Sequence, residues 1–234
     1  MSRVLAAHQP NYLPWLGLFH KLSLADVWVI ADDVQYTTHG FGNRNKIRTA
    51  TGWQWLTVPV LTKGRGRMQI REVMTDGARN WQRKHWEAIR WNYHHGRGFE
   101  EIGVFLENFY CHNEWERLVD ANIELGRYLV EQLGTEVEVC RSSDLELRQE
   151  RTERLVDMVA ACDCDVYLAG DGGSRKYLDE APFDEAGIEL RFAEFSHPVY
   201  EQCFPGFEAD MSALDLLLSF GSERAREVMG LGKT

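Results

Sequence analysis

The sequence predicts an α/β fold: a mostly parallel sheet flanked by helices, with an inserted β-hairpin and helical segment. Three observations predict it: short β-branched apolar segments recur along the 234 residues, amphipathic segments alternate with them, and glycine- or proline-rich loops follow several of them. Hydrophobic residues make up 44% of the chain and charged residues 26%, as in globular proteins. We therefore expect a single α/β domain over residues 1–234.

The N-terminal residues predict a β-loop-α-β unit. Arg3–Ala7 and Asp26–Ala31 have the composition of buried strands, and Trp15–Leu24 between them has apolar residues at helical spacing. Pro14 stands where the first turn of a helix tolerates proline. Such a unit joins parallel strands, so ligands should bind outside the carboxyl ends of those strands.

The middle of the chain is basic and aromatic. Trp53–Val60 and Met68–Met74 predict two strands joined through a Lys63–Arg67 turn, and the aromatic-rich Asn80–His95 predicts a helix. Phe99–Leu133 reads as helical up to a stop at Gly134. We expect residues about 43–133 to form a basic, largely helical sub-lobe.

The C-terminal part again alternates strands with helices, and the loop that follows the predicted strand Asp165–Ala169 is rich in glycine. The predicted elements are the strands Glu136–Cys140, Asp165–Ala169 and Ile188–Phe195 and the helices Arg151–Ala161 and Ser212–Phe220.

Charge is distributed unevenly. The chain carries a net −10, but residues 43–97 hold twelve Lys or Arg against three Asp or Glu, which is +9 and leaves −19 for the remainder. A local positive field attracts anionic ligands, so we expect an anionic small-molecule substrate, a nucleotide or nucleotide sugar. The acidic whole and the lack of a recognised motif argue against a long nucleic acid.

No apolar run reaches the roughly 18 residues that span a bilayer, and the N-terminus lacks the order of a signal peptide. Five cysteines without a CxxC pair predict neither a disulfide framework nor a common zinc site. These features predict a cytoplasmic protein without membrane insertion, compatible with a homodimer.

Polar residues gather in four segments where strands end, and we expect these four loops to converge on one pocket. His8 opens a loop stiffened by two prolines, and Asp32 and Asp33 follow the second strand, where alternation would turn only one of them toward a site. Histidine and carboxylates can transfer protons or, for the carboxylates, bind Mg²⁺. The alternatives are a structural turn at His8, salt bridges at the aspartates, a flexible connector at the glycine loop and a structural role for His197. The candidate catalytic residues are His8, Asp32, Asp33 and His197.

Candidate binding residues lie in the same segments. Amides, phenols and cations there can orient a ligand, and glycines let the backbone approach a phosphate. They are Gln9, Asn11, Tyr12, Trp15, Gln35, Asn43, Arg44, Lys46, Gly170, Gly173, Lys176, Tyr177 and Tyr200.

Seven segments in matching order carry a resemblance over nearly the whole chain. They are AHQPNYLPWLGLFHK, DDVQY, NRNKIR, WLTVPV, YLAGDGGSRKYLD, FSHPVYEQ and the Ser212–Asp215 stretch. Together they resemble the WbqC-like protein family, found in bacterial surface-polysaccharide gene clusters. The resemblance implies transfer of glycine or another acyl group to an amino sugar. Asp171, Arg175, Cys162 and Cys164 depart from the family pattern.

A weaker similarity concerns the first strand, its histidine loop and the helix that follows. This opening is similar to that of pantothenate synthetase-like adenylate-forming enzymes, in which a HIGH-type histidine loop holds ATP phosphates. The similarity implies that His8 takes this role and that His20 replaces the second histidine of the motif. ATP and Mg²⁺ would then be the cofactors.

We therefore expect a biosynthetic enzyme that forms an amide by acyl or aminoacyl transfer to a sugar or other amine, with ATP activating the carboxylate. Two alternatives remain open: a nucleotidyltransferase acting on a phosphorylated sugar, and a non-catalytic binding or scaffold protein. The sequence leaves the metal unknown.

Overall fold

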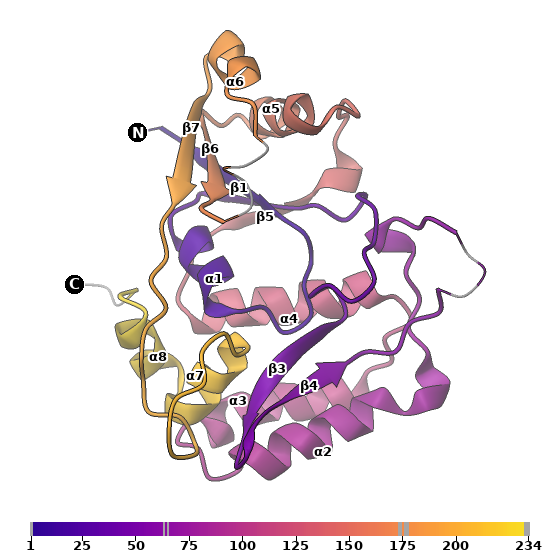
Figure 1. Ribbon diagram of the computed structural model, residues 1–234, viewed down its shortest axis with the longest axis vertical. Helices are drawn as coiled ribbons and strands as arrows, with labels where there is room; N and C mark the ends of the chain where they lie inside the picture. Colours follow the sequence, from indigo (N-terminus) through magenta and orange to yellow (C-terminus); the bar gives the residue numbers. More distant parts are fainter. Residues whose placement is uncertain (1, 63, 65, 173–174, 176–177, 232–234) are drawn as a thin grey trace. The chain divides into compact units, whose positions relative to one another are not determined.

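The computed structural model describes residues 2–62, 64, 66–172, 175 and 178–231 (Figure 1). The chain divides into two compact units. The sheet unit consists of Met1–Gln9, Gly17–Val34 and Thr135–Ser196; the helical unit consists of Pro10–Leu16, Gln35–Gly134 and His197–Thr234. The single domain with a sub-lobe over about 43–133 stays a prediction.

Five parallel strands make up the sheet of the sheet unit, in the order β5-β2-β1-β6-β7. They are β1 (Val4–His8), β2 (Val27–Ile30), β5 (Glu138–Arg141), β6 (Val166–Gly170) and β7 (Glu189–Ala193). The predicted parallel α/β sheet is confirmed, with its strand positions correct to within a few residues. Counted along the chain, the order is third, second, first, fourth, fifth, which is the order of a doubly wound sheet.

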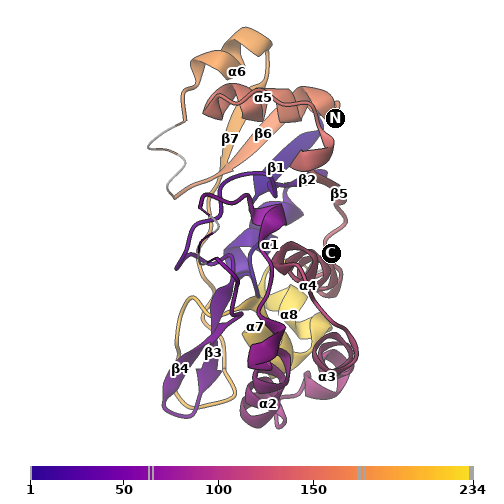
Figure 2. The same ribbon diagram turned by 90° about the vertical axis from the view of Figure 1, so that its right-hand side faces the viewer.

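Helices cover both faces of this sheet. Figure 2 shows α5 (Arg151–Ala161) and α6 (Ala181–Ala186) on one face and α1 (Leu16–Ser23) on the other. Alternation along the strands explains the arrangement, because successive side chains point to opposite faces. The buried residues that pack between the strands and α5 and α6 are Leu5, Val27, Val29, Val156, Met158, Val159, Tyr167, Ala169, Phe183 and Ile188.

Pairing between β1 and β6 ends early. Their register runs only from Val4↔Val166 to Leu5↔Tyr167. By contrast, β1 stays paired with β2 as far as His8↔Ile30, and β6 stays paired with β7 as far as Gly170↔Ala193. Toward their carboxyl ends, β1 and β6 are therefore no longer paired with each other, and each is paired only with its outer neighbour, β2 or β7.

The helical unit contains an antiparallel hairpin and several helices. Its elements are β3 (Arg44–Thr49), β4 (Gly52–Thr57), the 3-10 helices η1 (Ile70–Glu72) and η2 (Gly77–Arg79), α2 (Trp81–Tyr93), α3 (Phe99–Glu107), the π-helix η3 (Asn108–His112), α4 (Leu118–Gln132), α7 (Ala213–Phe220) and α8 (Ser222–Val228). The sheet unit adds the 3-10 helix η4 (Ser142–Asp144).

The predicted strand at Met68–Met74 is wrong. Its centre is the 3-10 helix η1, in which the Glu72 carboxylate accepts a 2.8 Å hydrogen bond from the backbone N–H of Gln69. The partner of β4 is β3, whose sequence RNKIRT was not predicted as a strand. Its polarity misled the prediction, because only Asn45 and Ile47 face inward with Arg48 buried beside them.

The predicted continuous helix Phe99–Leu133 is wrong in its middle. After α3 the chain widens into the π-helix and then leaves helical geometry until Leu118. The indole N–H of Trp115 donates to the Phe109 carbonyl at 2.9 Å, which folds the intervening segment back on the π-helix. The stop at Gly134 is confirmed, since its φ of 68° lies in the left-handed region.

None of the helices in the described ranges combines the length and apolar character needed to cross a bilayer. All five cysteines are free thiols.

Close backbone contact joins the turn before α3 to the end of α7. Gly98 N–H donates to the Leu218 carbonyl at 3.1 Å. A Cβ added at Gly98 would lie 2.0 Å from the Leu217 carbonyl oxygen and 2.4 Å from the Gly221 nitrogen. Only glycine allows this approach, because both neighbours are backbone atoms that cannot rotate away.

We predict that Gly98→Ala destabilises the protein by about 2 kcal/mol or more, which lowers the thermal midpoint by roughly 4–8 °C. Gly77→Ala is the matched control, because nothing lies within 4 Å of its added Cβ and its φ is ordinary. Thermal unfolding followed by circular dichroism measures both. Equal midpoints for the two variants would contradict the close packing.

Candidate functional site

The carboxyl ends of all five parallel strands meet at one edge of the sheet, and several of the predicted site residues lie there. His8 ends β1, Gly170 ends β6, and Asp32 lies two residues beyond β2. The order reverses between β1 and β6, so this is the switch point at which doubly wound sheets bind ligands. The structure thus places His8 beside the start of the glycine-rich loop.

His8 is half-buried at this switch point. Its carbonyl accepts the N–H of Ala31 at 2.9 Å, and its Nδ1 lies 2.7 Å from the carbonyl oxygen of Gln9. Because a carbonyl only accepts, Nδ1 carries the proton and Nε2 keeps a lone pair. Burial, and then the nearby charge of Lys21, lower the pKa of His8 to about 4. At neutral pH the ring is therefore an uncharged acceptor.

Lys21 supplies the positive charge next to it. Its side chain comes from the last turn of α1, is 6% exposed, and donates from Nζ to the Ala7 carbonyl at 2.9 Å. No ion pair to Lys21 occurs among the described residues. Burial lowers the pKa of Lys21 to about 8. The ammonium thus remains charged at pH 7, and a backbone carbonyl is its acceptor among the described residues. Its charge contributes to the lowered pKa of the His8 imidazole.

Asp32 and Asp33 lie at the same edge, but their carboxylates are already bound. Fully buried Asp32 forms an ion pair with Arg141 at 2.6 Å and also accepts from Ser143. Asp33 pairs with Arg154. The expectation that the two point apart is wrong, because the Ser142 hydroxyl lies within hydrogen-bond distance of both, an arrangement that the turn after β2 permits.

These contacts fix the charge of Asp33. Burial raises its pKa, but hydrogen bonds from Ser142 and Arg154 outweigh burial and hold the pKa below its ordinary value. Within the described part of the chain, no three His, Cys, Asp or Glu side chains gather as a metal site would require. The roles of Asp32 and Asp33 as base or Mg²⁺ ligand stay predictions, and both carboxylates would first have to leave their arginines.

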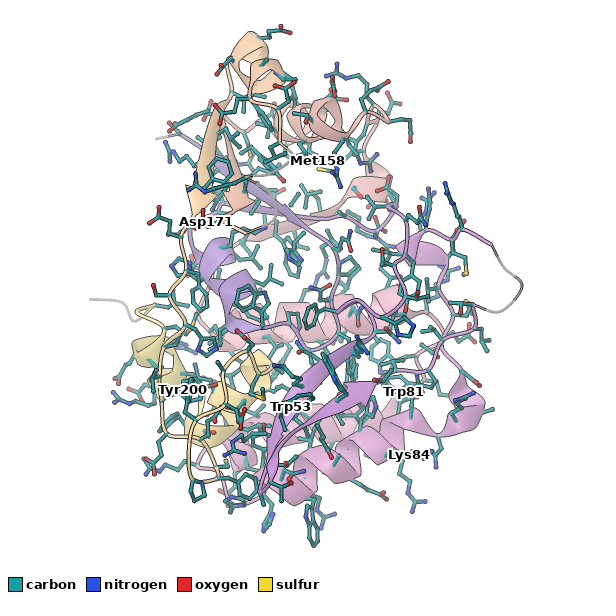
Figure 3. All side chains as sticks on the ribbon, in the orientation of Figure 1. Trp53, Trp81, Lys84, Met158, Asp171 and Tyr200 are labelled. Carbon is teal, nitrogen blue, oxygen red and sulfur yellow. The ribbon has the colours of Figure 1, made fainter. Side chains whose placement is uncertain are left out.

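The glycine-rich loop is only partly described. Gly173, Lys176 and Tyr177 lie outside the described residues. Asp171, labelled in Figure 3, follows β6 and pairs with Arg175, whose guanidinium lies 4.2 Å from the ring centroid of Phe192. Nothing lies within 4 Å of a Cβ added at Gly170, so the backbone is open at the end of β6.

The remaining candidates belong to the helical unit, and several of them form hydrogen bonds with other residues of this chain. The buried Tyr12 hydroxyl lies 2.8 Å from Nδ1 of His85 and 2.5 Å from the Tyr110 hydroxyl. Asn43 donates to the Val58 carbonyl at 2.8 Å, next to the hairpin.

A buried carboxylate organises the C-terminal segment. Asp215 accepts from the hydroxyls of Tyr93 at 2.7 Å and Tyr200 at 2.8 Å and from the Gln202 amide at 2.8 Å. His197 stacks on Tyr200 at 6.3 Å and its Nδ1 lies 2.8 Å from the Pro198 carbonyl. These contacts hold Tyr200 inside the unit, so its hydroxyl is occupied.

Gln35 and Trp15 are exposed candidates in the helical unit, the first in an isolated bridge with Gln69, and Arg44 and Lys46 are half-buried. Asn11 is half-buried. Convergence of all four predicted loops on one pocket stays a prediction. In the sheet unit, His8, Gln9, Asp32, Asp33 and Gly170 share one edge.

Sequence reasoning missed Lys21. The signal was present, because a lysine stands next to the apolar stripe Leu18, Phe19 and Leu22 on a short helix that packs against the sheet. The centroid of the His20 ring lies 5.3 Å from that of Phe195, and its part in a HIGH-type motif stays a prediction.

Comparisons with known proteins agree with the resemblance. The WbqC-like protein family model matches residues 9–227. An uncharacterized protein of Mycobacterium tuberculosis is 37% identical over 220 residues, covering 94% of each chain. No solved structure matches the chain. A family match over most of the chain and a relative above 30% identity show that this protein belongs to the WbqC-like protein family.

Proposed function

We propose that this protein is an amide-forming enzyme whose phosphate-bearing substrate binds at the carboxyl ends of β1 and β6. The observation that carries the proposal is the buried, unpaired ammonium of Lys21 at the switch point of a doubly wound sheet. A buried charge without a counter-ion is costly unless a ligand supplies the opposite charge. An anion that binds beside Ala7 and His8 would do so.

The chemistry consistent with this edge is activation of a carboxylate by ATP. A carboxylate oxygen attacks the α-phosphorus and pyrophosphate leaves; an amine then attacks the acyl carbon and AMP leaves. Lys21 would stabilise negative charge on the phosphate, since a fixed cation in a water-poor site acts strongly there. His8, neutral with a free Nε2, would accept a hydrogen bond or proton from the attacking amine.

This assignment changes the expected role of His8. A histidine with a pKa of about 4 does not present a cation to a phosphate at neutral pH. Lys21 would present the cation to the phosphate, and His8 would transfer a proton. The acyl acceptor, proposed as an amino sugar or other amine, follows from the family resemblance.

Exchange of labelled pyrophosphate into ATP tests the reaction class. With Mg²⁺ and a mixture of proteinogenic amino acids as carboxylate donors, we expect exchange that depends on one donor. Exchange that requires a sugar phosphate instead would indicate the nucleotidyltransferase alternative. Acyl transfer without ATP would contradict carboxylate activation.

We predict that His8→Ala lowers turnover by about 10²-fold or more while the thermal midpoint changes little. The backbone bond to Ala31 survives the substitution, and the ring bonds only the neighbouring carbonyl, so no other group loses its partner. Amine-dependent release of AMP per folded molecule, the step at which His8 is proposed to act, and the thermal midpoint are measured together. A lowered midpoint with normal specific activity would make His8 structural.

We predict that Lys21→Met weakens ATP binding and raises the thermal midpoint. The lowered pKa corresponds to roughly 3 kcal/mol of unfavourable interaction for the ammonium, which the nearly isosteric methionine removes. In the wild type, ATP affinity should fall as the pH rises through about 8, because Lys21 then loses its proton. The variant should lack this step. Calorimetric titrations at pH 7 and 9 measure both; tight binding by Lys21→Met would contradict the role.

A further inference from the structure

One face of the hairpin β3–β4 exposes aromatic rings together with cations. We call it the hairpin face and define it as Phe41, Arg44, Lys46, Trp53 and Trp55. The register pairs Lys46 with Trp55, and alternation along each strand puts the four hairpin residues on one side. Asn45, Ile47 and Leu56 are buried on the other side. The hairpin therefore has a core side and a side open to solvent.

The rings of the hairpin face remain accessible although they touch one another. Phe41 is 52%, Trp53 45% and Trp55 37% exposed. The two indole centroids are 5.8 Å apart, and Phe41 lies 6.1 Å from Trp55. Large aromatic side chains seldom stay exposed in contact with one another without a partner, so the cluster marks a binding surface.

Both cations lie over these rings. The Arg44 guanidinium is 4.5 Å from the centroid of Trp55, and the Lys46 ammonium is 5.2 Å from that of Trp53. No ion pair to either cation occurs within the described residues, and Arg44 Nε has no hydrogen-bond partner there. The rings position both positive charges, the Arg44 guanidinium also donates to the His39 carbonyl at 2.6 Å, and no described carboxylate neutralises either charge.

We infer that the hairpin face is a binding site for a nucleoside diphosphate, whose base stacks on the indoles and whose phosphates pair with Arg44 and Lys46. The two cations are two residues apart on one strand, roughly 7 Å, so a diphosphate can face both. Indole rings stack on bases without strong preference for one base. The site lies wholly within the helical unit, so the inference stands apart from the proposed reaction.

Charge selects this ligand over two others. An uncharged sugar would stack on the rings but leave both cations unused. A long single-stranded nucleic acid would extend past residues 43–97, whose charge is +9, and would be repelled by the rest of the chain, which brings the net charge to −10. A compact nucleoside diphosphate uses both features of the face at small electrostatic cost.

Calorimetric titration of the full chain with UDP and with ADP tests the inference. We expect both to bind within about tenfold of each other, and Trp55→Leu and Lys46→Gln each to weaken binding about fivefold or more. Trp91→Leu and Lys84→Gln are matched controls, because both residues are exposed on α2 and are not part of the hairpin face; Figure 3 shows Lys84 apart from Trp53. The controls should bind as the wild type does.

Four results at the hairpin would overturn the inference, and a fifth, at the sheet edge, would do so as well. They are absence of UDP and ADP binding at millimolar concentration; equal affinity of the hairpin variants and the controls; tighter binding of an oligouridylate than of UDP through the same residues; and a change only in oligomeric state. Loss of UDP binding in Lys21→Met alone would place the nucleotide at the sheet edge, against the inference and in keeping with the proposed function. Binding at the hairpin without pyrophosphate exchange would leave the inference intact.

Discussion

β1 occupies the middle of the sheet because the crossover through α1 places β2 on one side of it, and the crossover through α5 places β6 on the other. At the carboxyl edge the chain leaves β1 through α1 toward β2 and leaves β6 through α6 toward β7, in opposite directions, which is the arrangement that opens a crevice between two neighbouring strands. The early end of the β1–β6 ladder follows from the same geometry. Everything proposed for the sheet edge depends on this central strand.

The two titratable groups at the switch point influence each other through that geometry. Lys21, on α1, donates to the carbonyl of Ala7, the residue before His8 on β1. The charge of its ammonium lowers the pKa of the His8 imidazole. The pair is thus a cation next to a neutral acceptor. This is the charge pattern that a reaction needs when it builds negative charge on a phosphate while removing a proton from an amine. Asp32 and Asp33 are, by contrast, neutralised by Arg141 and Arg154 and tie β2 to η4 and α5.

The sequence was most informative where local pattern and burial coincide. β2 is apolar throughout and α5 has a regular amphipathic period, so both were predicted with nearly correct bounds. It was least informative at β3, whose buried polar residues Asn45 and Arg48 satisfy their hydrogen bonds through distant partners such as Leu13 and Gln202. Lys21 escaped notice for the same reason, since its acceptor belongs to another strand. Partners that are remote in sequence leave no local pattern.

Hydrogen–deuterium exchange with and without ATP tests the central claim most directly. If ATP binds at the switch point, peptides that contain the ends of β1 and β6 should exchange more slowly in its presence, because ligand binding suppresses local opening. Peptides from α5, which packs on one face of the sheet and not at its carboxyl edge, should change less. Slower exchange confined to the helical unit, with the ends of β1 and β6 unchanged, would contradict the account.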